Sequence, residues 1–505
     1  MADTVSGAEE KTGGGTWREG AWLAGGLAVF LLVNCLTAER SPAVWSDEVM
    51  YQDPGVNLYQ GHGFTSGAWW LQTRDKFWAG NVPLYQFVVY GWLKVFGFSI
   101  VTVRCLHYAL VSAAVLTGWL AIRRLNLIQT PSHRLLFCAI ACLCTATTFV
   151  FRFARPESLG ILLAALALLS FSLRPRWISL VMLVLSGILL AGCGLQLAAY
   201  AAVMSGLVLV LGPRRLLPEM AALCAGCAIG GGLIWLFYSQ HGVWQDFVAS
   251  VRHTTIANKG TNYLGATAYG KGFFYKLKKA PGLYEDYSVV PLLGLAAWMI
   301  WSLARAGLLR WRSPLVFGLA AMAAVPLGLH TVGIFPMYYF WMAFFPLTVG
   351  ICAELGRWQG LQRGRLAALA LAVCVGLACA VGLPRRLLLA SLDWNGRNYG
   401  PVMKLADPYV PRDKLVFCDY AAYYAAKQHG AEVILPVYLW LQSADDKARV
   451  SVAIIREADP AWLARQFGGT WLESGMGLNP PLPKWWFREN MDSRQYHLHV
   501  YLRQP

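Results

Sequence analysis

The sequence predicts a polytopic α-helical membrane protein with about 11 transmembrane helices and a small α/β domain at its C-terminal end. The 505-residue chain is 57% hydrophobic and only 14% charged, with a mean hydropathy of +0.45. Soluble domains average about 25% charged residues. The apolar residues form blocks of about 17–22 residues, long enough to cross the hydrocarbon core as helices. In contrast, residues 384–505 alternate between strand-like and helix-like segments.

The apolar blocks give the predicted order of the spans. The first has no small-residue cleavage site, so we expect it to be kept as an anchor rather than removed as a signal peptide. Most of the blocks are separated by short polar turns. The eleven predicted spans are 20–37, 99–121, 134–150, 157–173, 177–193, 195–211, 220–238, 289–304, 314–330, 337–353 and 366–383.

Arginine-rich turns alternate with turns that contain almost no Arg or Lys. The rich set is "RRLNLIQTPSHR", "RPR", "GPRR", "RAGLLRWR" and "GRWQGLQRGR". The positive-inside rule places this set and the N-terminus in the cytoplasm, and an odd number of spans places the C-terminus outside. The expected parts are a disordered cytoplasmic tail 1–19, a transmembrane domain 20–383 with outer (periplasmic) loops 38–98 and 239–288, and an outer α/β domain 384–505.

The net charge of +16 does not predict nucleic-acid binding. Much of the Lys and Arg lies in short turns between apolar blocks, where it sets orientation. Eleven of the twelve cysteines lie in or beside these blocks, which is typical of small packing residues. Composition therefore predicts membrane lipids as partners, with no nucleic acid.

Two of the three long outer regions, 38–98 and 384–505, differ in pattern. Residues 38–98 contain clustered Trp and Tyr interrupted by charges and Pro83, so we expect interfacial helices there rather than a span. The C-terminal region contains the strand-like segments "KLVFCDY", "AEVILPVYL", "RVSVAIIRE" and "YHLHVYLR". It also contains the helix-like segments "AAYYAAKQHG" and "AWLARQFGG". This alternation predicts a partly parallel sheet.

Asp47 and Glu48 are the first candidate catalytic pair. They lie in "WSDEVMYQDPGVNLYQGHGF", shortly after the first span, where a carboxylate avoids the cost of about 2.5–3.5 kcal/mol at the bilayer centre. A solvated loop acid is the simpler alternative. However, the chain has only 27 acidic residues, and these two lie among aromatic residues and glycines that indicate a shaped loop.

A second acidic feature, "FRFARPESLGILL", lies at the outer mouth of the fourth span. Pro156 and Glu157 suit the first turn of a helix, where a carboxylate complements the helix dipole. That capping role fully explains Glu157. It does not explain Arg152 and Arg155 on the side that should be poor in arginine. A guanidinium can grip a phosphate bidentately, so both are candidate ligands for a lipid-linked phosphate.

Other basic residues have two open interpretations. The loop 239–288 is rich in lysine, and Lys259 and Lys271 either attract anionic headgroups or bind a phosphorylated substrate. Arg104, near the outer end of the second span, either contacts phosphate or extends its stem toward the interface.

These features together resemble a known family. The acidic pair is followed by "GHGF", by "NVPLYQFVVYGWLKVFGF", by the Arg-Pro-Glu at span four and by "PMYYFWMAFFPL". Over residues 20–355 this pattern is similar to the GT-C membrane glycosyltransferases, in the bacterial branch of protein O-mannosyltransferases and the lipid A aminoarabinose transferase. The segment "DWNGRNYG" at 393–400 only half matches the Trp-Trp-Asp motif of oligosaccharyltransferases, which argues against that branch.

The resemblance implies that the first loop acid, here Asp47, is the catalytic base. The second-loop acid of the family is commonly Asp, and Glu157 stands in its place. The implied enzyme is an inverting hexosyl or pentosyl transferase of the cell inner membrane. It moves a sugar from a polyprenyl-phosphate donor to a hydroxyl of an extracytoplasmic glycan, lipid or protein.

The residues themselves lead to the same expectation. Asp47, Glu48 and Glu157 are the candidate catalytic acids. No cofactor is expected to be required, and a divalent metal stays an open alternative that no motif supports. The chain contains no Asp-x-Asp triplet, the usual grip on a nucleotide and its metal, which argues against a nucleotide-sugar donor. The alternative is a lipid or sugar transporter, which would place polar residues near the midplane of the membrane. The candidate donor-phosphate ligands are Arg152, Arg155, Arg104, Lys259 and Lys271.

Overall fold

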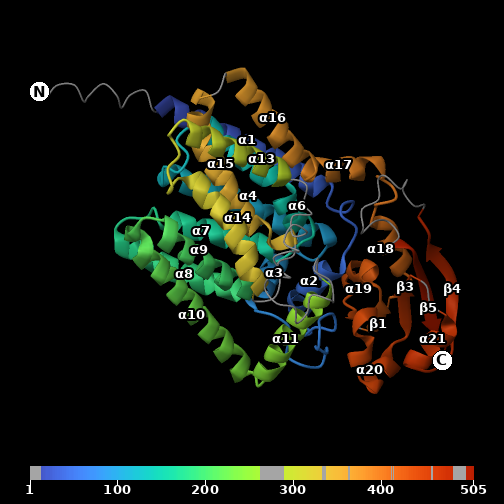
Figure 1. Ribbon diagram of the computed structural model, residues 1–505. Coiled ribbons are helices and arrows are strands. Elements are labelled where there is room, and N and C mark those ends of the chain that lie inside the picture. The colour runs from blue at the N-terminus through green and yellow to red at the C-terminus, as the bar shows by residue number, and fades with distance from the viewer. Residues whose placement is uncertain are drawn as a thin grey trace, which may run out of the picture.

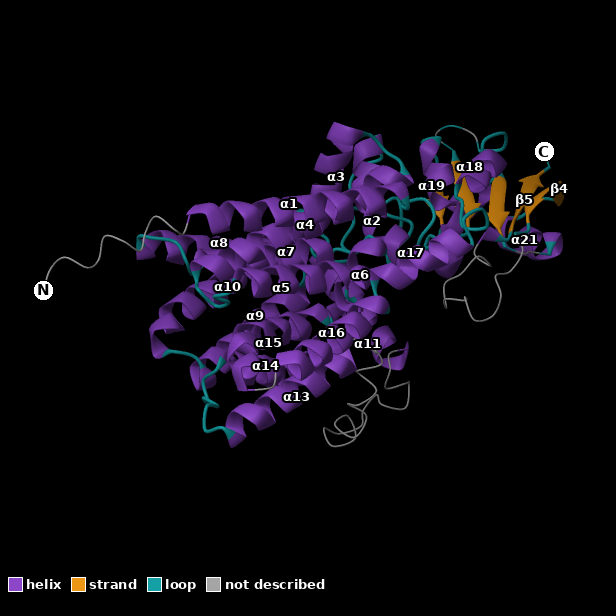
Figure 2. Ribbon diagram, turned by 90° about the horizontal axis from the view of Figure 1, so that it is seen from above, coloured by secondary structure: helices purple, strands orange, loops and turns teal. Residues whose placement is uncertain are grey.

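The computed structural model is a bundle of long helices with an α/β unit at one end (Figure 1). Seen from above, the helices of the bundle run side by side and the strands gather beyond them (Figure 2). The structure describes residues 13–261, 289–331, 337–361, 364–410, 412, 414–456, 459–480 and 496–504.

The first half of the chain supplies eleven of the described helices. The long apolar ones bury one another's side chains, and two shorter ones, α2 and α3, occupy the predicted outer loop. Their bounds are α1 Gly13–Leu36, α2 Ser46–Gln60, α3 Leu84–Phe96, α4 Ile100–Arg124, α5 Pro131–Leu143, α6 Thr145–Arg152, α7 Glu157–Ser170, α8 Arg176–Cys193, α9 Leu195–Leu211, α10 Leu217–Gln240 and α11 Trp244–Thr261.

The second half completes the bundle. Short 3-10 turns, η1 Arg214–Leu216 and η4 Met337–Tyr339, precede α10 and α15. The helices are α13 Val289–Arg305, α14 Pro314–Thr331, α15 Trp341–Leu361, α16 Gly364–Ala380 and α17 Leu383–Leu392.

Every predicted span coincides with helical structure, which supports a polytopic membrane protein. Among the described residues, four helices are long and apolar enough to cross a membrane, or six if each of two bent pairs is one span. One bent pair is α5 and α6, which meet at 49° inside the predicted span 134–150. Four further apolar helices are shorter, α7, α9, α13 and α14. The number of spans therefore stays a prediction.

The predicted interfacial region 38–98 folds into α2 and α3, which pack closely on each other. Gly55 makes the contact possible, because a Cβ at this position would lie 2.7 Å from the carbonyl oxygen of Gln86 on α3. The two helices are 15 and 13 residues long. Both are shorter than the ~20 residues that a span needs.

The α/β unit is built on a five-stranded sheet of order β2-β1-β3-β5-β4. β2, β1 and β3 are parallel, whereas β5 and β4 are antiparallel additions. Its elements are α18 Gly400–Ala406, β1 Leu415–Cys418, η5 Tyr420–Ala422, α19 Tyr423–Gln428, β2 Glu432–Ile434, η6 Pro436–Leu441, α20 Ala444–Arg449, β3 Val452–Ile455, α21 Pro460–Phe467, β4 Trp471–Leu478 and β5 Leu498–Arg503.

Four of these strands coincide with the predicted strand segments, but β4 was not predicted. It is an edge strand with mostly exposed side chains, and its pairing with β5 shifts register between Glu473 and Gly477. Such a strand lacks the apolar alternation by which strands are recognised.

The sheet and the bundle share one buried apolar core. The largest cluster of buried apolar side chains runs from Leu23 in α1 to Val500 in β5. α19 lies beside α2 in both views (Figures 1 and 2). The side of the membrane on which this unit lies stays a prediction.

Candidate active site

The acidic pair lies in the first turn of α2. The helix begins at Ser46, after Trp45 in an extended conformation. Asp47 and Glu48 therefore both lie in its first turn, near the helix N-terminus, where negative charge is favoured. Successive side chains on a helix point about 100° apart. The two carboxylates therefore diverge into different surroundings: Glu48 is fully buried, whereas the side chain of Asp47 is 27% exposed.

Glu48 forms a buried ion pair with Arg104 of α4. The guanidinium donates in bidentate fashion, from Nε to Oε1 at 2.8 Å and from Nη2 to Oε2 at 2.7 Å. Its Nη1 donates to the carbonyl oxygens of Ala38 and Pro42, at 2.6 and 2.8 Å. Arg104 thereby joins α4 to the segment that links α1 and α2.

These contacts change the interpretation of Arg104 and Glu48. The side chain of Arg104 is 0% exposed, and each of its three nitrogens donates to an acceptor within the protein. Neither of the two sequence-based alternatives, a phosphate contact or a stem reaching for the interface, agrees with that burial. A phosphate would have to displace a carboxylate from a fully buried site. The geometry instead favours a structural pair.

Asp47 belongs to a second cluster around Arg155. Arg155 donates to Glu157 from Nε at 3.0 Å and from Nη2 at 3.2 Å, and its Nη1 donates to Oδ2 of Asp47. Arg155 and Glu157 are buried, so only Asp47 of these three side chains reaches an open surface. The structure thus brings together three of the predicted site residues, and it pairs Arg155 with carboxylates.

Aromatic rings enclose the guanidinium of Arg155. Its Cζ atom lies 3.5 Å from the ring centroid of Tyr338, 5.1 Å from that of Tyr51 and 5.5 Å from that of Trp45. Such cation–π contacts stabilise a desolvated cation. The predicted site did not include these rings, although Trp45 and Tyr51 lie in the aromatic segment around the acidic pair and Tyr338 lies in the segment "PMYYFWMAFFPL".

The backbone that presents Arg155 is strained. Ala154, in the turn between α6 and α7, has a φ of 48°, a left-handed conformation that alanine rarely adopts. Strain of this kind persists where the surroundings impose it, and it is concentrated at functional sites. The turn places Arg155 two residues before Glu157, the first residue of α7, with Pro156 between them.

Burial and charge act in opposite directions on this cluster. Burial alone would lower the pKa of Arg155, but the carboxylates of Glu157 and Asp47 raise that pKa above its ordinary value. Burial raises the pKa of Tyr51 well above its ordinary value, so its phenol stays neutral near pH 7. The site therefore contains a permanent cation beside a half-buried carboxylate.

Arg152 has a structural environment. It ends α6, is fully buried, and donates from Nη1 to Asn34 Oδ1 and Thr37 Oγ1, each at 3.0 Å. It also donates to the carbonyl oxygen of Ser41. These contacts fasten α6 to the end of α1, so they do not support the predicted phosphate contact.

The remaining predicted ligands are not placed by the structure. Lys259 lies in α11, but its side chain is outside the described residues, and Lys271 lies outside them altogether. Within the described parts of the chain, no group of three or more His, Cys, Asp and Glu side chains is arranged to hold a metal ion. The expectation that no cofactor is required stays untested.

The comparisons with known proteins give a match in structure alone. No family model and no curated protein matches the sequence. The crystal structure of ArnT from Cupriavidus metallidurans, bound to undecaprenyl phosphate, superposes with a TM-score of 0.58 at 11% identity, covering 95% of this chain and 98% of that one.

Two further solved structures are less similar. The mycobacterial arabinofuranosyltransferase AftD has a TM-score of 0.48 at 16% identity and covers 96% of this chain and 40% of its own. The oligosaccharyltransferase AglB from Archaeoglobus fulgidus has a TM-score of 0.45 at 10% identity, covering 87% and 70%. The match to ArnT along nearly the whole of both chains, together with the apolar helices, shows that this chain is a polytopic membrane protein with the GT-C fold.

Proposed function

We propose that the protein is a membrane glycosyltransferase that moves a sugar from a polyprenyl-phosphate donor to a hydroxyl of an extracytoplasmic acceptor. The observation that carries this proposal is the partly exposed Asp47, held by Arg155 while the side chains of Arg155 and Glu157 are buried. A carboxylate in that position can meet a substrate without losing its counter-ion. The fold shared with ArnT, whose structure contains undecaprenyl phosphate, supports the class of donor.

In the proposed reaction, the acceptor hydroxyl attacks the anomeric carbon and Asp47 takes its proton as general base. The bond from that carbon to the phosphate oxygen breaks, and the lipid phosphate leaves with the electron pair. Phosphate is a good leaving group, so no second carboxyl group is needed to protonate it, unlike in a glycosidase. A single displacement inverts the anomeric configuration.

Arg155 and Glu157 act on Asp47 in this scheme. The guanidinium of Arg155 lies between the two carboxylates, so it holds Asp47 in one orientation, and Glu157 anchors Arg155 from the buried side. The rings of Tyr338 and Tyr51 confine the guanidinium. This role replaces the direct phosphate contact that the sequence suggested for Arg155.

The donor phosphate then needs other cations. Arg104 and Arg152 are committed to internal contacts, so we exclude them, and Lys259 and Lys271 remain proposals. We add Arg386 of α17, a half-buried residue whose Cζ lies 4.8 Å from the ring centroid of Phe153. The ring centroids of Phe153 and Trp45 lie 5.3 Å apart. These two rings therefore lie between Arg386 and the region of Asp47, the proposed base.

The orientation and the cofactor requirement belong to the same proposal. The arginine-rich turns support a cytoplasmic N-terminus, with Asp47 facing the periplasm or its equivalent in the cell inner membrane. The scheme contains no step that needs a metal. A chelator should therefore leave the transfer rate of the reconstituted enzyme unchanged, and loss of activity that added Mg²⁺ or Mn²⁺ restores would contradict this part of the proposal.

The decisive assay gives proteoliposomes a polyprenyl-phosphate sugar or a nucleotide sugar, each with an acceptor extract. Transfer from the lipid donor alone, with an inverted anomeric centre by NMR, is the expected result. Movement of labelled donor across the bilayer without a new glycosidic bond would favour the transporter alternative. Efficient transfer from the nucleotide sugar would contradict both the donor and the outward-facing site.

A further inference from the structure

The α/β unit reaches the acidic helix α2 through the side chains of one short helix. Tyr423, Tyr424 and Lys427 of α19 all donate hydrogen bonds to polar side chains of α2, and all are buried. Burying hydroxyls and an ammonium group is costly unless their partners are held in place. The junction is therefore specific rather than a simple apolar contact.

The contact nearest to the site is the hydroxyl of Tyr424, which donates to Glu48 Oε1 at 2.9 Å. The same oxygen accepts from Nε of Arg104 at 2.8 Å. Glu48 is the residue next to Asp47, so its orientation sets the first turn of α2 on which Asp47 stands. Tyr424 thus completes the hydrogen bonds of a carboxylate one residue from the proposed base.

The second set of contacts lies farther along α2. Asp53 accepts from the hydroxyl of Tyr423 at 2.9 Å and from Ser66 at 2.7 Å, and the ammonium group of Lys427 lies 3.6 Å from its Oδ1. Lys427 also donates to the side chain of Asn57. Burial lowers the pKa of Lys427, and Asp53 opposes that change.

A third contact from the α/β unit meets the segment that precedes α2. The backbone N–H of Val44 donates to the hydroxyl of Tyr496, at 3.2 Å, just before β5 of the same α/β unit. Contacts from the C-terminal unit therefore lie on both sides of Asp47 in the sequence, at residues 44 and 48.

We propose that the α/β unit is a positioning device for the active site, and that Tyr424 is its principal positioning residue. The inference rests on the proposed function, because it gives Asp47 the role of base. Tyr424 does not meet the substrate. It holds Glu48, and with it the first turn of α2, so that Asp47 keeps the geometry that Arg155 and the acceptor need.

The test is Tyr424→Phe in the full-length reconstituted protein, with Tyr420→Phe as the matched control. Tyr420 lies four residues earlier, and its hydroxyl accepts from Arg456 within the same unit, whereas that of Tyr424 donates to α2. Both variants lose one hydroxyl. Because small misplacements of reacting groups can cost up to about 100-fold in rate, we expect Tyr424→Phe to lower kcat by about 10- to 100-fold. The donor KM should not change, and Tyr420→Phe should keep the wild-type kcat.

A second readout does not depend on activity. Hydrogen–deuterium exchange of the α2 amides should be faster in Tyr424→Phe than in the wild type and unchanged in Tyr420→Phe. Wild-type kcat in Tyr424→Phe would overturn the inference even if exchange were faster, since the contact would then be structural only. An equal loss of kcat in both variants would also overturn it.

Failure of the proposed function gives a different result. In that case the wild type itself would not transfer sugar from any lipid donor, while the exchange measurement would still report whether Tyr424 holds α2. Unchanged exchange in Tyr424→Phe would overturn the inference whatever the activity.

Discussion

Two arginine–carboxylate clusters begin on neighbouring residues of α2, and they differ mainly in access. Glu48 and Arg104 form a closed pair, fully buried and completed by Tyr424. Asp47, Arg155 and Glu157 form an open cluster in which one carboxylate reaches the surface. The same two residue types therefore give a structural joint on one side of the helix and a candidate reactive group on the other.

The difference teaches that charge type alone does not identify a site. A buried arginine whose donors are all satisfied can bind a ligand only by abandoning a desolvated carboxylate, which is strongly unfavourable. Partial exposure of one member removes that obstacle. Variants that act on one cluster and not the other therefore test the assignment.

The largest effect is expected for Asp47→Asn. The amide cannot accept the proton of the acceptor hydroxyl, and general-base catalysis typically contributes about 10²- to 10⁴-fold to the rate. We expect a loss of kcat of that size with normal insertion and folding. Asp75→Asn, which alters an exposed acid of the same outer region, is the control and should keep full activity. Near-normal turnover by Asp47→Asn would remove it as the base.

Arg104→Met should act on stability rather than on chemistry. Removing one member of a buried ion pair costs about 3–5 kcal/mol, because the partner charge is left uncompensated. Thermal unfolding in detergent measures the loss, with Arg124→Met on the same helix as an exposed control. Replacing Glu48 by Leu as well should recover part of the stability. A fully stable single variant with weakened donor binding would restore the phosphate-binding interpretation of Arg104.

Arg155→Lys should lower kcat while the fold survives. Lysine keeps the charge but cannot hold Glu157 in bidentate fashion and reach Asp47 at once. Hydrogen bonds to charged groups contribute about 1.5–3 kcal/mol, which corresponds to roughly 10- to 150-fold in rate. Steady-state kinetics at varied donor concentration would measure kcat and the donor KM separately. A rise in donor KM at constant kcat would instead indicate that Arg155 binds the phosphate directly.

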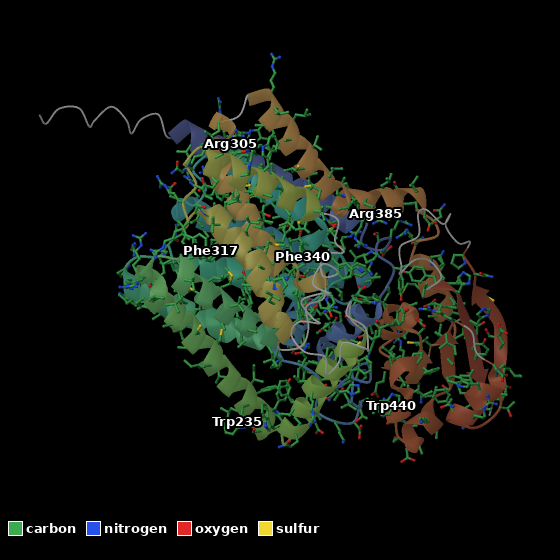
Figure 3. The ribbon with its side chains drawn as sticks, in the orientation of Figure 1. Trp235, Arg305, Phe317, Phe340, Arg385 and Trp440 are labelled. Atoms are coloured by element: carbon green, nitrogen blue, oxygen red, sulfur yellow. The ribbon has the colours of Figure 1, made fainter. Side chains whose placement is uncertain are left out.

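The smallest effect is expected for Arg386→Gln, which should raise the donor KM by about 10-fold and leave kcat unchanged. The reason is the loss of one charge-assisted contact to the lipid phosphate. Arg385→Gln is the matched control, because its exposed side chain lies on the same helix, α17 (Figure 3). Equal effects of the two variants would point to a general loss of positive charge rather than to a specific contact.

The helical bundle was predictable because burial in lipid demands long apolar segments, and these are visible as local composition. The sequence also located the acidic pair, the Arg-Pro-Glu turn and four of the five strands. It did not reveal the bend between α5 and α6 or the edge strand β4, because neither has a periodic apolar signal.

The candidate site also has features that local sequence predicts and features that depend on long-range packing. Local sequence suffices to place Glu157 at a helix start, since helix-terminal preferences involve only a few neighbouring residues. Asp47 and Glu48 were expected in a shaped loop, and the structure places them instead in the first turn of α2. Which arginine meets which carboxylate depends on contacts 56 and 108 positions apart in the chain. Burial, and with it the separation of a closed pair from an open one, arises only when α2, α4, α7 and α19 pack together. No local pattern encodes that packing.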